Sequence, residues 1–254
     1  MLKRYQYNLS AVSPIIISPR EQQAFFEEYR IYPFYQYGAY DEYDPEHAQY
    51  YIPGSSIKGA LITPERGLLR VDDIRVSNKD IKLSELLKVQ HILSKKELEQ
   101  AKGNVKSLRL EPFFSNVKFE MLESDYAYTG YFFCGEKDAE LYKSLIKCKK
   151  SVEKKLNAFQ SHIDELIERY ISKKEKKTEE ECIQKLKKTS KNINYLRKQS
   201  GEFKENETLL LLGGYKGILL SMVQDQKPAE VQSGIFLDKN KCLPYGLAKI
   251  KVNM

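Results

Sequence analysis

Residues 51–61 read YIPGSSIKGAL, and this stretch predicts a strand that turns sharply into a helix. Pro53 disfavours helix at the residue before it, and Gly54 allows the chain to bend. Ser55 or Ser56 can then act as the N-cap of a helix that begins just after them. We therefore expect the first helix of the protein to start here, at the end of an extended apolar segment.

A helix start of this kind presents free backbone N–H groups and the positive end of the helix dipole, and Lys58 adds a cation. Together these groups suit a phosphate. The alternative is an ordinary capped helix packed under a strand, with Lys58 in solvent. A P-loop is excluded, because Gly59 follows Lys58 where a serine or threonine would bind magnesium, and the spaced glycines are missing.

The composition is that of a globular protein with a local basic region. The chain has 254 residues, of which 41% are hydrophobic and 30% charged, enough for one large domain or two small ones. Residues 146–200 contain sixteen lysines and arginines against eight acids, whereas the rest of the chain is close to neutral. This distribution favours a polyanionic partner. The 18 tyrosines would suit base stacking as well as core packing.

The cysteines, histidines and apolar runs exclude several classes of protein. The four cysteines lie far apart without a CxxC pair, which argues against a zinc ribbon or a disulfide framework and for a reducing cytoplasm. The three histidines share no metal-ligand spacing, so we expect neither a metal nor a cofactor. No apolar run is long enough to span a bilayer, and no secretory h-region follows the charged N-terminus, so we expect no membrane association.

The first 50 residues predict a strand followed by an aromatic and acidic segment. Apolar and polar residues alternate over residues 5–17, which predicts the strand. Residues 25–29 (FFEEY) predict one or two helical turns, and residues 32–38 (YPFYQYG) predict an extended element or hairpin arm. His47 is a candidate for acid–base chemistry. The acids that precede it predict a solvated loop rather than a metal site: Asp41, Glu42, Asp44 and Glu46.

The middle of the chain continues with strands and then changes to a helical period. The first helix should run over residues 56–62, because Pro64 interrupts it. Apolar positions predict strands over the ranges 68–77, 86–92, 108–121 and 126–134. From residue 138 the apolar residues recur at steps of three and four, which predicts a long amphipathic helix to about residue 170 and a second helix from 178 to 200.

The two long helices should fold back on each other as an antiparallel hairpin over residues 136–200. Its basic outer faces could follow RNA, dock a neighbouring subunit or simply face solvent. After the hairpin, residues 208–212 (TLLLL) predict a buried strand that runs into Gly213, Gly214, Lys216 and Gly217. Paired glycines let a backbone approach another backbone or a phosphate closely.

The sequences of these segments resemble motifs of the RAMP superfamily, the RNA-binding subunits of CRISPR effector complexes. The most specific segments are IPGSSIKGA within residues 51–61, which resembles the family signature, and DIRVS at residues 73–77. The second segment resembles a sequence motif of the RAMP subunits that cap the 3′ end of the guide RNA in type III-A (Csm) complexes. Further motifs of the family are resembled, in the same order along the chain, by residues 108–121, 213–217 and 243–250.

The resemblance implies an α+β fold: a ferredoxin-like (RRM-like) RAMP core in a single domain over residues 1–254, with the helical hairpin as an elaboration and a C-terminal Gly-rich loop. It implies a non-catalytic subunit of a cytoplasmic antiviral ribonucleoprotein that caps the crRNA and supports its maturation. The partners would be crRNA, other RAMP backbone subunits, small helical subunits and host nucleases. The residues expected to contact RNA are Gly54, Ser55, Ser56, Lys58, Arg75, Gly213, Gly214 and Lys216.

Three alternatives remain open from the sequence. A backbone RAMP subunit that cleaves target RNA carries an aspartate in a loop after the first strand, and here only Glu21 is acidic in that region. A guide-processing endoribonuclease of the same superfamily would use a histidine, for which His47 is the candidate. The third alternative is a protein-interaction module built on the hairpin, which would bind no RNA.

Overall fold

The computed structural model describes residues 3–19, 22–38, 43–61, 69–89, 108–135, 138–171, 177–221 and 234–253. Glu21, Pro64 and the segment 90–107 lie outside the described residues, so the predictions made for them stay predictions. The side chains of 138–140, 169–171, 177–179 and 218 also lie outside the description.

The largest sheet has five strands, each antiparallel to its neighbours, in the order β13-β15-β1-β12-β6. Strand β1 lies at the centre and pairs with β12 and β15 along most of its length. Its alternating sequence buries one face and exposes the other, as predicted, but the strand ends at Ala11 instead of continuing to residue 17, and beyond it Ile15 forms an isolated bridge to Leu122. The strand bounds are β1 Lys3–Ala11, β6 Leu69–Val71, β12 Ala127–Cys134, β13 Glu207–Leu211 and β15 Leu247–Asn253.

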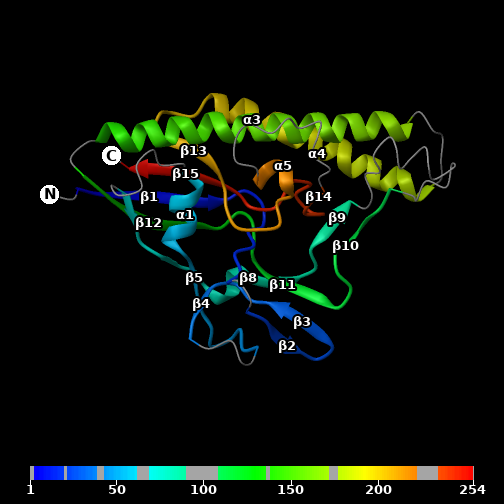
Figure 1. Cartoon of the computed structure of the whole chain (residues 1–254), viewed down its shortest axis with the longest axis horizontal. Helices are drawn as coiled ribbons and strands as arrows, with labels where there is room; N and C mark the ends of the chain where they lie inside the picture. The colour runs from blue at the N-terminus through cyan, green and yellow to red at the C-terminus, as the bar shows by residue number, and fades with distance from the viewer. Residues whose placement is uncertain are drawn as a thin grey trace.

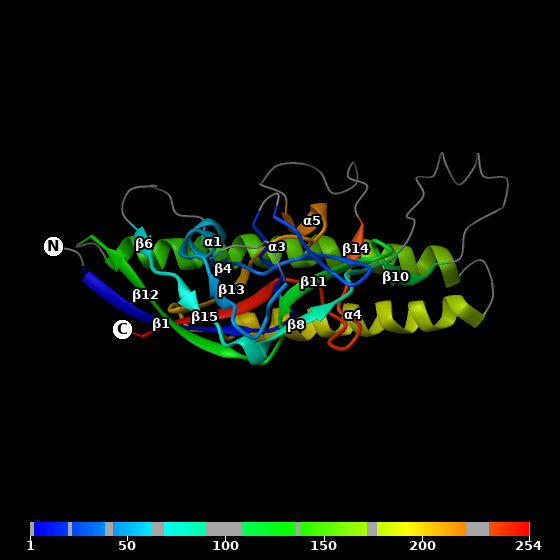
Figure 2. The ribbon, with the colours of Figure 1, turned by 90° about the horizontal axis from the view of Figure 1, so that it is seen from below.

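The helices form a second layer over the buried face of this sheet (Figures 1 and 2). The long helices α3 (Asp138–Ile171) and α4 (Lys177–Gly201) run antiparallel and side by side in both views, which confirms the predicted hairpin. Two hydrogen bonds join them, from Gln160 to Ser190 and from Arg197 to Gln160. The short helices are α1 (Gly54–Ala60) and α5 (Ile218–Ser221).

Three smaller sheets accompany the large one, two of them in the lower part of Figure 1 and the third, which contains β9, β10 and β14, at its right. The first has the order β2-β3-β11-β8, the second β4-β5-β7 and the third β10-β9-β14. Their strands are short: β2 Ala24–Phe26, β3 Tyr29–Tyr32, β4 Gln36–Tyr37, β5 Gln49–Ile52, β7 Ile74–Arg75, β8 Ile81–Ser84, β9 Leu87–Val89, β10 Leu110–Pro112, β11 Val117–Leu122 and β14 Ile235–Phe236. The extended elements predicted within residues 32–38, 108–121 and 126–134 are thus present as strands, and so is the described part of the one predicted for 86–92, of which residues 90–92 lie outside the description.

Two local predictions are wrong. Residues 25–29 form the β2–β3 hairpin rather than helical turns, because Phe25 and Phe26 pair with Arg30 and Tyr29 across a turn in which Glu27 has a φ of 52°. The segment 68–77 is also not one strand. Its two halves pair with different partners, β6 with β12 and β7 with β5, so the chain bends between Val71 and Ile74.

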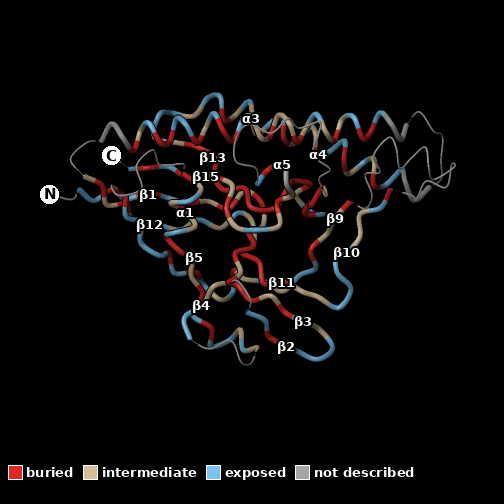
Figure 3. Tube along the Cα trace, in the orientation of Figure 1, coloured by how far each residue is buried: buried red, intermediate tan, exposed pale blue. Residues whose placement is uncertain are grey.

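One continuous apolar core joins the helices to the large sheet, and Figure 3 shows its buried stripe along α3. Tyr7, Leu9 and Phe132 from the sheet pack in the same cluster as Ile57 of α1 and Phe159 of α3. The predicted apolar stripe of α3 is therefore confirmed as the face that covers the sheet.

Candidate nucleic-acid interface

The motif stretch at residues 51–61 ends β5 and forms α1, and its first turn meets the bend between β6 and β7. The backbone N–H of Gly54 donates to Oδ1 of Asp73 at 2.8 Å. Gly54 packs so closely there that a Cβ atom at this position would lie 2.0 Å from the carbonyl oxygen of Val71. Only glycine fits such an approach without a shift of the backbone.

The helix begins earlier than predicted, and neither serine caps it. Its N-cap is Pro53, without a side-chain cap hydrogen bond, and Ser55 and Ser56 lie inside the first turn. Asp73 supplies the cap instead, since a carboxylate at a helix start satisfies a free N–H and is favoured by the dipole. Lys58 falls in the last turn of this seven-residue helix. Ser55 is exposed, whereas Ser56 and Lys58 are half-buried.

An aromatic and basic surface lies beside the helix start on the outer face of the β4-β5-β7 sheet. Tyr51 stands opposite Arg75 in the strand pairing, and Arg75 is exposed. The rings of Tyr37 and Tyr51 stack with centroids 4.2 Å apart, and Tyr37 is 46% exposed. The hydroxyl of Tyr37 donates to Oδ2 of Asp73, so one carboxylate joins this surface to α1. Burial and then Asp73 raise the pKa of Tyr37, whereas Arg75 lowers it.

Sequence reasoning found Arg75 but not its tyrosine neighbours. The alternation of side chains along the paired strands would have identified these tyrosines. Tyr51 and Arg75 lie on the outer face of their strands, and Tyr37 lies on the same face opposite Gln49. This alternation places the tyrosines beside Arg75 only once the strand register is known, and the register depends on the pairing of β5 with β7, whose paired residues Tyr51 and Arg75 are more than twenty residues apart.

The glycines expected in a phosphate-binding loop are mostly engaged inside the protein. Gly213 has a φ of +71°, and a Cβ there would lie 2.0 Å from the carbonyl oxygen of Ile16. The N–H of Gly214 donates to the same oxygen at 2.9 Å. The close approach that the glycines permit is thus to the backbone that follows β1. A Cβ at Gly214 would meet no atom within 4 Å, so that side of the segment is open.

Lys216 points inward. The side chain is 8% exposed, and its ammonium group donates to the carbonyl oxygen of Gly213. Burial, with a smaller contribution from Lys155, lowers the pKa of Lys216 to about 8. The described geometry therefore gives Lys216 a role in holding the 213–217 turn.

Cys148 of α3 joins the two expected RNA-binding regions. Its thiol lies 3.3 Å from the carbonyl oxygen of Ala60, at the end of α1, and 3.5 Å from that of Leu209 in β13. Burial raises the pKa of this thiol to about 12. The structure thus brings α1 and the strand that leads to Gly213 to the same side of α3.

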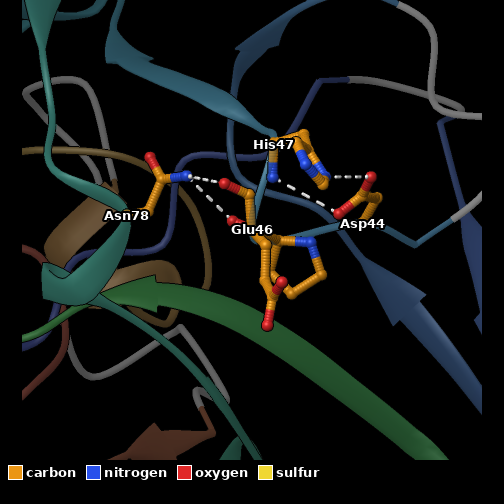
Figure 4. Close-up of polar contacts among 5 residues, drawn as sticks. Asp44, Glu46, His47 and Asn78 are labelled. Carbon is orange, nitrogen blue, oxygen red and sulfur yellow. Dashed lines mark hydrogen bonds and ion pairs between the residues drawn. The ribbon is translucent and has the colours of Figure 1, made fainter.

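His47 lies at the surface with one acidic partner (Figure 4). Its ring Nδ1 is 2.8 Å from Oδ2 of Asp44, and both side chains are exposed. The hydrogen bond from His47 lowers the pKa of Asp44. Asn78 donates to the carbonyl oxygens of Pro45 and Glu46 and so fixes the turn that carries His47.

The acids around this turn do not form a metal site in the part of the chain that the structure describes, where no cluster of three potential ligands occurs. Glu120 is a separate, fully buried carboxylate. It accepts hydrogen bonds from the hydroxyl of Tyr50 and from the N–H of Phe34, so both of its oxygens are engaged in the fold. Burial raises the pKa of Glu120. The four cysteines are buried thiols that form no disulfide with one another.

No protein-family model and no curated protein matches this chain. Among solved structures, it is similar to a chain of a "Csm-crRNA-target RNA ternary complex in type III-A CRISPR-Cas system", with a TM-score of 0.45, 10% identity and coverage of 98% of this chain and 100% of that chain. It is also similar to oligomeric Cmr4 from Pyrococcus furiosus, with a TM-score of 0.26, 11% identity and coverage of 60% and 90%. At TM-scores below 0.5, neither likeness fixes the function of this chain.

None of the helices in the described ranges combines the length and the apolar character needed to cross a bilayer.

Proposed function

We propose that this protein is an RNA-binding RAMP subunit of a type III-A (Csm) CRISPR effector, which caps the 3′ end of the crRNA and supports its maturation. The observation that carries the proposal is the meeting of the two most specific motif segments, 51–61 and 73–77. They join through the pairing of Tyr51 with Arg75 and the hydrogen bond from Gly54 to Asp73. The segments that resemble the family therefore form one surface unit.

A ferredoxin-like core is part of this proposal, and the strand order supports it. Four strands of the large sheet have the order β15-β1-β12-β6, all antiparallel, with α1 between β1 and β6 and α3 between β12 and β15. This is the order of a β-α-β-β-α-β unit, in which each helix crosses over to cover the same face. Strand β13 would then be an addition at the edge, and the α3–α4 hairpin an elaboration of the second crossover.

The RNA contact proposed at α1 uses side chains rather than the helix dipole. The N–H of Gly54 already has a carboxylate partner, so the contact falls to Ser55, Lys58 and Arg75 around it. Contacts of this type hold phosphates without reading the sequence. At the second region, Gly214 offers the open side for a close approach, while Gly213 and Lys216 shape the turn.

We propose that the subunit is not a nuclease. His47, the candidate base, stands on an exposed turn with its Nδ1 paired to Asp44, and the resemblance implies a branch without catalysis. Glu21, the other candidate, stays untested. Glu21→Ala and His47→Ala proteins should therefore process guide RNA and target RNA as the unchanged protein does, in purified complexes.

The partners in this proposal are crRNA, RAMP backbone subunits, small helical subunits and host nucleases in the cytoplasm. The exposed side of the α3–α4 hairpin is available for a neighbouring subunit. We expect affinity purification of the tagged protein from its own cells to recover RNAs of one repeat-derived class together with RAMP proteins. Arg75→Glu should deplete that RNA, whereas Lys79→Glu, at an exposed lysine four residues later, should not. Recovery of the protein without RNA and without such partners would overturn the proposal.

A further inference from the structure

The large sheet has a second face, opposite the helices, on which many side chains of β1, β12 and β15 are exposed. Along β1, Tyr5, Tyr7 and Leu9 are buried against the helices, and the intervening Arg4, Gln6 and Asn8 are exposed. The same alternation continues in β12, where Phe132 is buried while Tyr131 and Phe133 are half-buried on the outer face. This outer face carries aromatic and basic side chains among polar ones.

Strand register arranges these side chains in rows across the sheet. In one row, Phe133 lies between Arg4 on one side and Arg70 on the other. In the next, Tyr131 lies opposite Gln6, and the guanidinium of Arg4 stacks over its ring at 3.7 Å from the centroid. A third row runs from Thr129 through Asn8 to Lys251.

The face carries an excess of positive charge. Arg4, Arg70, Lys249 and Lys251 lie on it, against Glu207 and Asp72. Glu207 lies 3.5 Å from the ammonium of Lys249 and 3.6 Å from that of Lys251, and its side chain is only 12% exposed between them. Lys249 also covers the ring of Phe203 at 4.2 Å from the centroid. Since the chain outside residues 146–200 is close to neutral, this is a local concentration of basic groups.

We propose that this outer face binds single-stranded RNA, with bases stacked on Phe133 and on the pair formed by the Arg4 guanidinium and the Tyr131 ring, and with Arg70 and Lys251 beside the phosphates. Aromatic rings and arginine planes on an open antiparallel sheet are the general means by which proteins hold unpaired bases. Asn8 and Thr129, hydrogen-bonded to each other at 3.3 Å, add polar groups between the rings and Lys251. The inference rests on the proposed function and adds a second RNA surface, separate in sequence from the α1–β7 surface.

A protein partner is the competing occupant. Arginine and aromatic side chains also occur in protein–protein interfaces, but lysine is depleted there, and this face carries Lys249 and Lys251. The net positive charge matches a phosphate backbone, so the observations favour RNA.

The first test uses the absence of tryptophan from the chain. A Tyr131→Trp variant of the full chain would contain a single indole on the outer face. Titration with single-stranded RNA oligonucleotides should quench its emission and retain affinity, because a larger ring still stacks on bases. A Phe25→Trp variant, at an exposed phenylalanine of β2 outside the basic hairpin, is the control and should not respond. Unchanged indole emission from the Tyr131→Trp variant at saturating RNA would overturn the inference.

The second test measures salt dependence with variants at exposed side chains, which leave the core untouched. Arg70→Gln with Lys251→Gln should flatten the slope of log K against log salt by about 1.4, since each lost phosphate contact on a single strand contributes about 0.7. Lys79→Gln with Lys239→Gln, at exposed lysines elsewhere, should leave the slope unchanged. Tyr131→Thr should weaken binding about tenfold.

The outcomes separate the two proposals. If the unchanged protein, purified in its complex, carries no RNA, the proposed function fails. If it binds RNA and these variants bind as well as it does, only the sheet surface is wrong. Quenching of the Tyr131→Trp variant by co-purifying subunits instead of RNA would make the face a protein interface and would also overturn the inference.

Discussion

The N–H of Gly54 donates to Oδ1 of Asp73 at 2.8 Å, so a carboxylate from the β6–β7 bend caps the helix that the motif stretch begins. The second oxygen of Asp73 accepts the hydroxyl of Tyr37 at 3.2 Å. One side chain therefore connects three segments that are distant in sequence: the aromatic strand β4, the motif helix and the strand that carries Arg75. We expect this connection to fix the surface proposed to hold RNA.

Replacing Asp73 by alanine should lower the free energy of unfolding by about 1 kcal/mol, the usual cost of losing a helix cap. Urea unfolding followed by circular dichroism would measure it. Asp72→Ala is the matched control, because Asp72 is an exposed neighbour whose hydrogen bond to the Tyr131 carbonyl uses its backbone N–H. Equal stability of the two variants would mean that the hydrogen bond between Gly54 and Asp73 contributes nothing to the fold.

Two adjacent glycines should respond very differently to alanine. Gly213→Ala places a Cβ 2.0 Å from the carbonyl oxygen of Ile16 at a positive φ, so it should destabilise the protein by roughly 2 kcal/mol or more. Gly214→Ala meets no atom within 4 Å and should change stability by less than about 1 kcal/mol. Thermal unfolding of both variants tests this difference. A Gly213→Ala protein as stable as its neighbour would contradict the described packing of the turn.

The buried ammonium of Lys216 should make stability depend on pH in a defined direction. Its pKa of about 8 lies below the ordinary lysine value of 10.5, so the unfolded chain holds the proton more tightly. Stability from this group is lowest below pH 8 and rises between about pH 8 and 10.5. Lys216→Met should therefore stabilise the protein at pH 7 by roughly 1–3 kcal/mol.

The same comparison at higher pH provides the check on Lys216. The difference in unfolding free energy between Lys216→Met and the unchanged protein should shrink as the pH approaches 10.5. A constant difference from pH 7 to pH 10 would show that the ammonium is not buried as described. The difference cancels the titration of other groups, because both proteins share them.

The predictions that succeeded from sequence depended on local patterns. The apolar stripe of α3, from Leu141 to Leu166, has a helical period and needs no partner to be recognised. Alternation over β1 likewise shows which residues are buried. The antiparallel hairpin followed from two such helices and a short connection between them.

The features that sequence could not supply depend on contacts between distant segments. Ser55 and Ser56 have the chemistry of an N-cap, but Asp73 takes that place because the β6–β7 bend brings its carboxylate to Gly54. Lys216 has the chemistry of a phosphate ligand, but in the 213–217 turn its ammonium points inward and donates to the carbonyl oxygen of Gly213. Residues 25–29 mix aromatic and acidic side chains at no clear period, so their pairing as a hairpin was not readable.

The most direct test of the central claim is ultraviolet cross-linking of the purified native complex, with the RNA cross-linked to this subunit identified by sequencing. The proposal predicts cross-links to crRNA, concentrated in the nucleotides at its 3′ end and reduced by Arg75→Glu. Cross-links spread evenly along the guide or lying at its 5′ end would contradict the capping role. The absence of any RNA cross-linked to the subunit would contradict RNA binding itself.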